Sequence, residues 1–213
     1  MMTVMDDDQT FMGEGNQSKR MMQDARRALK SSGGHANLVK YLLKRVEGLF
    51  LASGDPMPKG EDVQALIVSG WIEELLRFLV IKTIAGDTTF PYEMAPSLPI
   101  NDAWKALMIM PSAYSKLCLA IGNDGVIDHD PFWDEDDDNK DYEFKSKHIN
   151  ITKRAYQDLF DQEPAKLYWA LPRESTGDKL MKMFRTSSMG SGVKLHKWAS
   201  MFSSSCQSPG GYS

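Results

Sequence analysis

The stretch "GEDVQALIVSGWIEELLRFLVIKTIAGD", residues 60–87, is the most apolar part of the chain. Its large apolar side chains cover more than one face of a helix: Val63, Leu66, Ile67, Trp71, Leu75, Phe78, Leu79 and Ile81. A helix that is apolar on several faces must be covered by other elements. The stretch therefore predicts a buried helix in a mostly α fold.

Amphipathic helices are predicted before this stretch. Ser18 is expected to cap the first of them, which has Met and Leu side chains on one face and ends at "SSGG", residues 31–34. The apolar positions of residues 38–50 recur at three- and four-residue intervals and predict a second helix.

Further helices are predicted after it. A loop with three prolines, residues 88–99, leads to a short helix that begins near Asn101. Pro111 interrupts the helical pattern, and Ser112 is expected to cap the helix that follows. The stretch "NITKRAYQDLF", residues 150–160, predicts another amphipathic helix.

Strand signals are nearly absent, because no run of residues alternates between apolar and polar. We therefore expect a single compact multi-helix domain over residues 17–173, with flexible tails at residues 1–16 and 174–213. Two short basic helices are plausible within the second tail.

Charge is distributed unevenly. The net charge is −4, and nothing in this total points to nucleic acid. Residues 124–143 hold ten acidic side chains and one lysine, which predicts a solvated acidic loop. Residues 144–213 hold eleven Lys or Arg against five Asp or Glu.

The compartment is inferred from the ends of the chain and from its cysteines. The N-terminus, "MMTVMDDDQT", is acidic where a targeting peptide would be basic, and no run is long enough for a membrane-spanning helix. Cys118 and Cys206 lie far apart and do not suggest a disulfide framework. We expect a cytoplasmic or nuclear protein with no transmembrane segment.

The segment 100–118 combines a Trp, a Tyr and a Cys on helical spacing. Trp104 shares a helix face with Leu107 and Met108, and Tyr114 shares one with Cys118. No His or Lys lies one turn from Cys118 to lower the pKa of its thiol, so core packing is favoured over a nucleophilic role.

The same region resembles a eukaryotic family, the domain at the N-terminus of plant glycine-rich domain-containing proteins, which is also found in algal and protist proteins. Matched spacing across several blocks makes this resemblance more specific than any single motif. The blocks, within residues 75–172, are "FLVIKTIAGD" (78–87), "APSLPINDAW" (95–104), Tyr114, Cys118, "DHDP" (128–131), "AYQDLFDQEP" (155–164) and Trp169.

The chain departs from the family pattern at its histidines. Lys105 and Leu107 stand where the family has His-x-His after the Trp, and Asp128 replaces the first residue of its His-His-x-Pro. His129 is the one family histidine that is retained. The Gly that follows the family's Phe is Asp161 here. The resemblance implies a divergent member, in which any function of the histidine cluster has been lost or altered.

Two possible metal-binding sites fit the sequence poorly. An EF-hand-like loop aligned from Asp134 has Asn139 where a Gly is needed and Lys145 where a Glu is needed. Asp128, His129 and Asp130 are consecutive, and consecutive side chains rarely converge on one ion. We expect no cofactor and assign no metal ligand.

The basic tail interleaves cations with Met, Phe and Trp in "KLMKMFRTSSMGSGVKLHKWASMF", residues 179–202. Such a segment suits weak contact with an anionic membrane surface or a calmodulin-like groove. A solvated basic tail, or one that docks on the acidic loop, is the preferred reading.

No phosphate-binding loop, nucleophile elbow or zinc-protease motif is present in the sequence. Our leading hypothesis is a non-enzymatic protein-interaction or scaffold domain with an unknown protein partner. The alternative is a metal- or ligand-binding protein, or a degenerate enzyme, that uses Asp128, His129 and Asp130. Trp104 and Tyr114 complete the set of candidate binding residues, and no catalytic residue is assigned.

Overall fold

The computed structural model describes residues 8–53, 61–90, 92–130 and 138–169. These residues form a mostly α single domain, as predicted, with no strand among them. Its helices are α1 (Asp8–Ser31), α2 (Gly34–Ser53), α3 (Glu61–Ile84), α4 (Leu98–Met108), α5 (Pro111–Ala120) and α6 (Asp138–Phe160). Within the described part of the chain, no helix is both long enough and apolar enough to cross a membrane.

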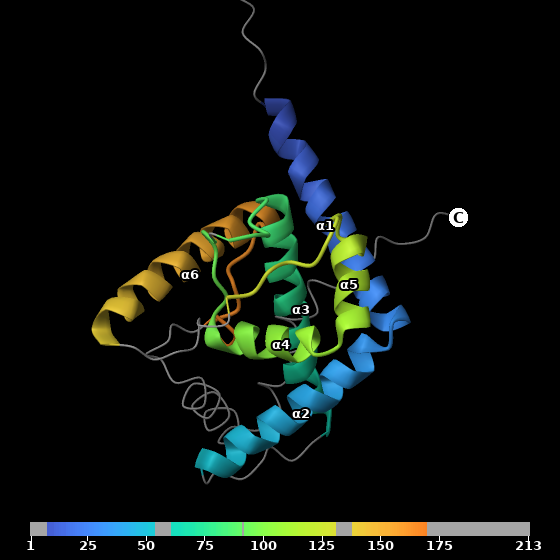
Figure 1. The fold of residues 1–213 in the computed structure, drawn as a ribbon, viewed down its shortest axis with the longest axis vertical. Coiled ribbons are helices and arrows are strands. Elements are labelled where there is room, and N and C mark those ends of the chain that lie inside the picture. The colour runs from blue at the N-terminus through green and yellow to red at the C-terminus, as the bar shows by residue number, and fades with distance from the viewer. Residues whose placement is uncertain (1–7, 54–60, 91, 131–137, 170–213) are drawn as a thin grey trace, which may run out of the picture.

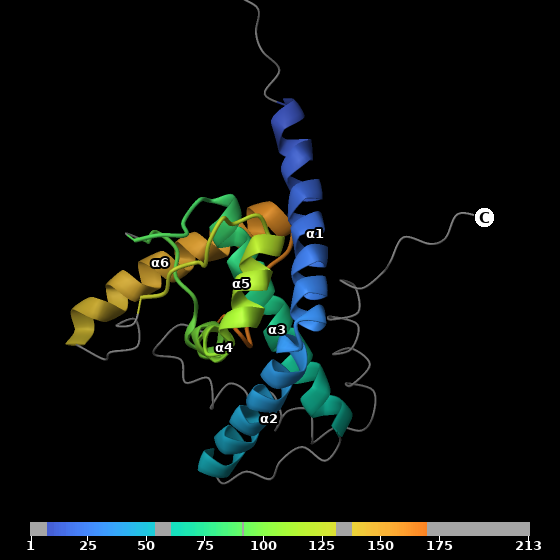
Figure 2. The same cartoon turned by 45° about the vertical axis from the view of Figure 1, so that its right-hand side comes forward.

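The apolar stretch forms α3, which lies in the middle of the molecule (Figure 1). It contacts α1, α2, α4 and α6, while α5 packs mainly against α1. Two views place α6 on one side of α3 and α1 on the other, while α2 runs across the lower part of the molecule (Figure 2). Of the eleven α3 residues from Trp71 to Ile81, all except Glu73 are buried. Several faces of this helix are therefore covered, as predicted.

A sharp corner joins α1 to α2 at two glycines. Gly33 has a φ of +73°, which a residue with a side chain rarely adopts. At Gly34 a Cβ atom would lie 2.7 Å from the Cβ of Ala113 in α5 and 2.9 Å from the Cδ1 of Leu29. The corner therefore packs against α5 more closely than any side chain would allow.

Gly34→Ala should destabilise the domain by about 1–3 kcal/mol, because the added methyl group overpacks this corner. Gly48→Ala is the matched control, since Gly48 lies in α2 with open space around it. That substitution should stabilise the helix by about 0.5–1 kcal/mol. Urea unfolding of both variants measures the difference. If Gly34→Ala behaved like the control, the close packing against α5 would be wrong.

The break at Pro111 is confirmed, but the residues that start the two helices differ from those predicted. Ser97 caps α4, with its side chain accepting a hydrogen bond from the Ile100 N–H, so the helix begins before Asn101. Ser112 is not a cap: Met110 holds that position for α5 and makes no side-chain cap bond. Pro111 occupies the first helical turn, where its missing N–H costs nothing.

Two helices are longer than predicted. Ser18 is not a cap but lies inside α1, where its buried hydroxyl donates to the Leu159 carbonyl at 3.1 Å. Residues 8–16, predicted as tail, are helical, and so are residues 138–143 of the predicted acidic loop. Once later turns are packed, extending a helix adds one hydrogen bond for each residue fixed, and local charge does not prevent it.

Several predictions concern residues outside those that the structure describes. They include the basic tail at 174–213 with its two short helices, and the central part of the acidic loop, residues 131–137. The membrane-surface and tail-docking predictions therefore stay predictions.

Candidate functional site

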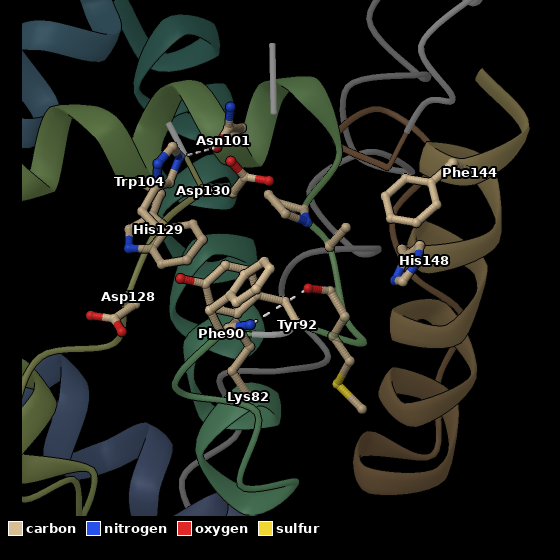
Figure 3. A pocket seen from close by; sticks show the side chains of 13 residues that line it. Lys82, Phe90, Tyr92, Asn101, Trp104, Asp128, His129, Asp130, Phe144 and His148 are labelled. Atoms are coloured by element: carbon tan, nitrogen blue, oxygen red, sulfur yellow. Dashed lines mark hydrogen bonds between the residues drawn. The ribbon is translucent and has the colours of Figure 1, made fainter. Parts of the chain in front are cut away.

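Four of the five predicted binding residues line one pocket. Trp104, Asp128, His129 and Asp130 lie around a cavity of about 320 Å³ (Figure 3). Tyr114 is not in the lining but behind it, where its hydroxyl accepts a hydrogen bond from the Trp104 indole N–H at 2.9 Å. Sequence reasoning did not assign the rest of the wall, which includes Lys82, Phe90, Tyr92, Asn101, Phe144 and His148.

The floor of the pocket is set by the C-terminal end of α3. Gly86 has a φ of +68°, and the Asp87 N–H bonds back to the Lys82 carbonyl at 2.9 Å. This turn brings the Asp87 carboxylate to 2.6 Å from the Lys82 ammonium. The same carboxylate accepts the N–H groups of Glu93 and Met94 at 2.9 and 3.1 Å, which fixes the loop that carries Phe90 and Tyr92.

Lys82 is an almost fully buried cation, 1% exposed. Burial lowers the pKa of its ammonium, whereas the hydrogen bond and charge of Asp87, together with the charge of Asp128, raise that pKa. The Nζ atom also lies 4.7 Å from the centre of the Tyr92 ring. An ion pair this deeply buried needs such additional contacts to offset its desolvation. Lys82 therefore belongs to the wall of the pocket and is already paired.

Hydrogen bonds to other described residues hold the segment that carries Asp128, His129 and Asp130. The Asp128 N–H donates to the Thr88 carbonyl at 2.9 Å, and the Tyr114 hydroxyl donates to the Ile127 carbonyl at 2.5 Å. His129 Nε2 lies 2.7 Å from the buried Asn101 side-chain oxygen. Because that oxygen only accepts, Nε2 carries the proton in this bond.

His129 and its neighbours do not converge on a common point. The His129 ring packs edge-on against Trp104, with ring centres 4.8 Å apart, and the carboxylates of Asp128 and Asp130 lie apart from each other (Figure 3). Among the described residues no three His, Cys, Asp or Glu side chains are placed to hold a metal ion. The EF-hand-like loop, residues 134–145, is described only in part: residues 134–137 lie outside the described ranges, and residues 138–145 are helical in α6.

Helix α6 supplies the opposite wall of the pocket. Phe144 and His148 are one turn apart, with ring centres separated by 4.2 Å, and His148 Nδ1 lies 2.8 Å from the Glu93 carbonyl. Their spacing of four residues is the signal that could have found this pair. Because Phe144 directly follows the predicted acidic loop, residues 124–143, this spacing was not predicted to be helical.

Comparison with protein-family models, curated proteins and solved structures finds no match for this chain. The family resemblance drawn from the motifs therefore stays a prediction. The pocket has to be interpreted from its own geometry.

A second polar cluster is buried between α3, α6 and the segment that follows α6. Glu74 accepts hydrogen bonds from Arg77 at 2.7 Å, from the Tyr156 hydroxyl at 3.0 Å and from the Trp169 indole at 2.6 Å. All four side chains are buried. Burial raises the pKa of Glu74, while the charge of Arg77 and the bonds from Trp169, Tyr156 and Arg77 lower it. The cluster therefore cross-links α3, α6 and the segment that follows α6.

Cys118 is fully buried, as the core-packing interpretation expects. Burial is the main cause that raises the pKa of its thiol, and hydrogen bonding with Ile127 and Tyr114 opposes the shift. A buried thiol with a raised pKa is poorly suited to nucleophilic catalysis.

Proposed function

We propose that the chain is a non-enzymatic protein-interaction domain and that the pocket is where it takes its partner. One observation carries this proposal: exposed aromatic side chains stand at the rim of a cavity. Phe90 is 77% exposed and Phe144 is 54% exposed, and both line the pocket. Apolar surface of this kind, bordered by polar groups, marks interaction sites on soluble domains.

The bonding of the polar lining favours binding over catalysis. Lys82 is paired with Asp87, His129 is bonded to Asn101, and His148 is bonded to the backbone of the loop between α3 and α4. A general base must be in reach of a substrate proton, and these groups already serve to hold the walls in place. The alternative, a metal- or ligand-binding protein or degenerate enzyme at Asp128, His129 and Asp130, stays a prediction with less support.

The proposal includes divergent membership of the glycine-rich domain-containing protein family. One backbone feature supports it. The family pattern has Gly after its Phe, and Asp161, which stands there, has a φ of +50°. Only Gly takes this left-handed conformation freely, and Asp is one of the few other residues that tolerate it. A glycine in the family pattern thus falls where the backbone favours one.

Site-specific photo-cross-linking tests the proposed function. A photoreactive phenylalanine analogue replaces Phe144 in the full chain, and the protein is irradiated in an extract of the cells that make it. We expect one or a few discrete cross-linked protein species from this position. Leu119 gives the matched control, because it is 57% exposed on α5 and does not line the pocket.

Competition defines the specificity of that cross-link. Excess unlabelled chain should abolish the cross-linked species, whereas excess chain carrying Phe90→Ser should compete less well. The same pattern of species from Phe144 and Leu119 would contradict the proposal, because the pocket would then be no different from the rest of the surface.

A further inference from the structure

Aromatic rings make up a large part of the pocket wall (Figure 3). They form three pairs, one in the loop between α3 and α4, one between α4 and the segment after α5, and one on α6: Phe90–Tyr92, Trp104–His129 and Phe144–His148. The ring centres are 5.6, 4.8 and 4.2 Å apart within these pairs, and the first two pairs meet edge-on. Because ring edges are partly positive and ring faces partly negative, a further aromatic ring finds favourable contacts here.

The cavity is large enough for two fused rings. Its volume is about 320 Å³, whereas an apolar cavity of about 150 Å³ is enough to hold benzene. Met94, Ala95 and Pro96 complete a lining that is mostly apolar, and Phe90 and Phe144 at the rim are exposed to solvent. Pockets for small molecules have this character, with apolar and aromatic walls and a few polar groups.

The charged groups of the pocket do not favour a charged occupant. Lys82 is in an ion pair with Asp87, and the charge of Asp128 also acts on Lys82. The carboxylates of Asp128 and Asp130 lie apart and do not converge on one point (Figure 3). A buried charge needs a partner to offset its loss of water. An uncharged ring has no such requirement, so it suits the interior of the pocket best.

His148 supplies a hydrogen-bond acceptor on the α6 wall, where its ring points from the helix toward the cavity (Figure 3). Its Nδ1 lies 2.8 Å from the Glu93 carbonyl, which only accepts, so Nδ1 carries the proton. In the neutral ring Nε2 then keeps its lone pair, and no described residue hydrogen-bonds to Nε2. The backbone contact thus fixes the tautomer and leaves one nitrogen to accept a hydrogen bond from a bound molecule.

We propose that the interior of the pocket binds an uncharged indole group, which packs among the aromatic rings and donates its N–H to His148 Nε2. This inference goes beyond the proposed function, because it concerns the interior of the cavity and not the protein that meets its rim. A free small molecule or a tryptophan side chain of the protein partner can supply the indole group, and the experiment separates these two sources.

A pair of probes tests the inference. Indole and benzofuran are bicyclic rings of nearly the same size, but benzofuran has an oxygen in place of the N–H donor. Binding to the full chain is followed by ¹H–¹⁵N NMR at about pH 8, where imidazole rings are neutral. We expect indole to shift the amides of Tyr92, His129 and His148, which line the pocket. Indole should bind about fivefold more tightly than benzofuran, as one hydrogen bond worth about 1 kcal/mol gives.

Variants of the chain identify the groups responsible. His148→Phe keeps a ring on α6 and removes the acceptor, so it should abolish the preference for indole while benzofuran still binds. Phe144→Leu removes one ring of the wall and should weaken the binding of both probes about fivefold. Tyr41→Leu is the matched control, because Tyr41 is 41% exposed on α2 and does not line the pocket. It should leave both affinities unchanged.

A capped five-residue peptide of glycine with a central tryptophan identifies the source of the indole group. If this peptide binds as tightly as indole, a tryptophan side chain of the protein partner fits the pocket. If only free indole binds, the ligand is a small molecule that the cavity surrounds. Either result supports the inference and decides between its two sources.

Equal affinity for indole and benzofuran would overturn the inference, and so would a preference for indole that survives His148→Phe. Absence of binding by both probes, or amide shifts outside the pocket lining, would overturn it as well. The Phe144 cross-link reports separately on the proposed function. Loss of probe binding with that cross-link intact would therefore leave the proposed function standing, and loss of both would remove both.

Discussion

Replacing Glu74 with leucine is expected to lower the free energy of unfolding by about 3–5 kcal/mol, as removal of one partner from a buried ion pair does. Glu74 is 3% exposed and accepts three hydrogen bonds. Without it the Arg77 guanidinium, 8% exposed, keeps its charge in an apolar interior, and the Trp169 indole N–H loses its acceptor. Both groups then bear the cost of desolvation without a partner.

The preceding residue provides a matched control. Glu73 also forms an ion pair, 2.7 Å from Arg26, but about a third of each of these side chains is exposed. Glu73→Leu should therefore cost only about 0–1 kcal/mol. A double variant, Glu74→Leu with Arg77→Met, should recover much of the loss, because it removes the orphaned charge. Equal costs at Glu73 and Glu74 in urea unfolding would show that the cluster does not hold the fold together.

Trp104→Ala is the second change for which we expect a large effect, a loss of about 3–5 kcal/mol. The indole is 2% exposed and packs edge-on against Phe78 at 5.2 Å between ring centres. Its N–H donates to Tyr114, whose hydroxyl holds the Ile127 carbonyl. Truncation would leave a cavity next to the pocket and would loosen the segment that carries His129.

Trp104→Phe distinguishes packing from the hydrogen bond, because it keeps an aromatic ring and removes the N–H donor. We expect an intermediate loss of stability in thermal or urea unfolding. For either variant, unchanged stability combined with loss of the Phe144 cross-link would contradict a core role and would place the Trp104 side chain on the binding surface alone.

The sequence predicted the fold class because its strongest pattern, a helix that is apolar on several faces, requires burial by other helices. A helix with apolar residues on several faces, residues 60–87, has to be surrounded, and α3 is. Pro111 likewise predicted the break between α4 and α5, since proline cannot donate the backbone bond that a helix interior needs. Helix starts were less predictable. Serine is a common helix cap, but neither Ser18 nor Ser112 caps a helix here. Where a helix starts depends on tertiary packing, which residue spacing does not reveal.

Only part of the candidate site was predicted, because its residues come from elements that are far apart in the sequence. Trp104 and the residues 128–130 were chosen from motif spacing, and the structure brings them to one pocket. Lys82 belongs to a block of the family resemblance but was not assigned to the site, because nothing in the sequence places it beside residues 128–130. Its role depends on Gly86, which turns the chain so that Asp87 reaches back to it.

The sequence by itself determined that the chain is helical, that α3 is buried and that Trp104 and Tyr114 lie on apolar helix faces, because periodicity and composition are local properties. Only the tertiary structure decided that Tyr92, His129 and Phe144 face one cavity. They come from a loop, an extended segment and a helix far apart in sequence, and contacts between such elements arise from the packing of α3 against α4 and α6. The tertiary structure also decided which charged groups meet: Asp128 and Asp130 line the pocket together with Lys82, and Lys82 is paired with Asp87.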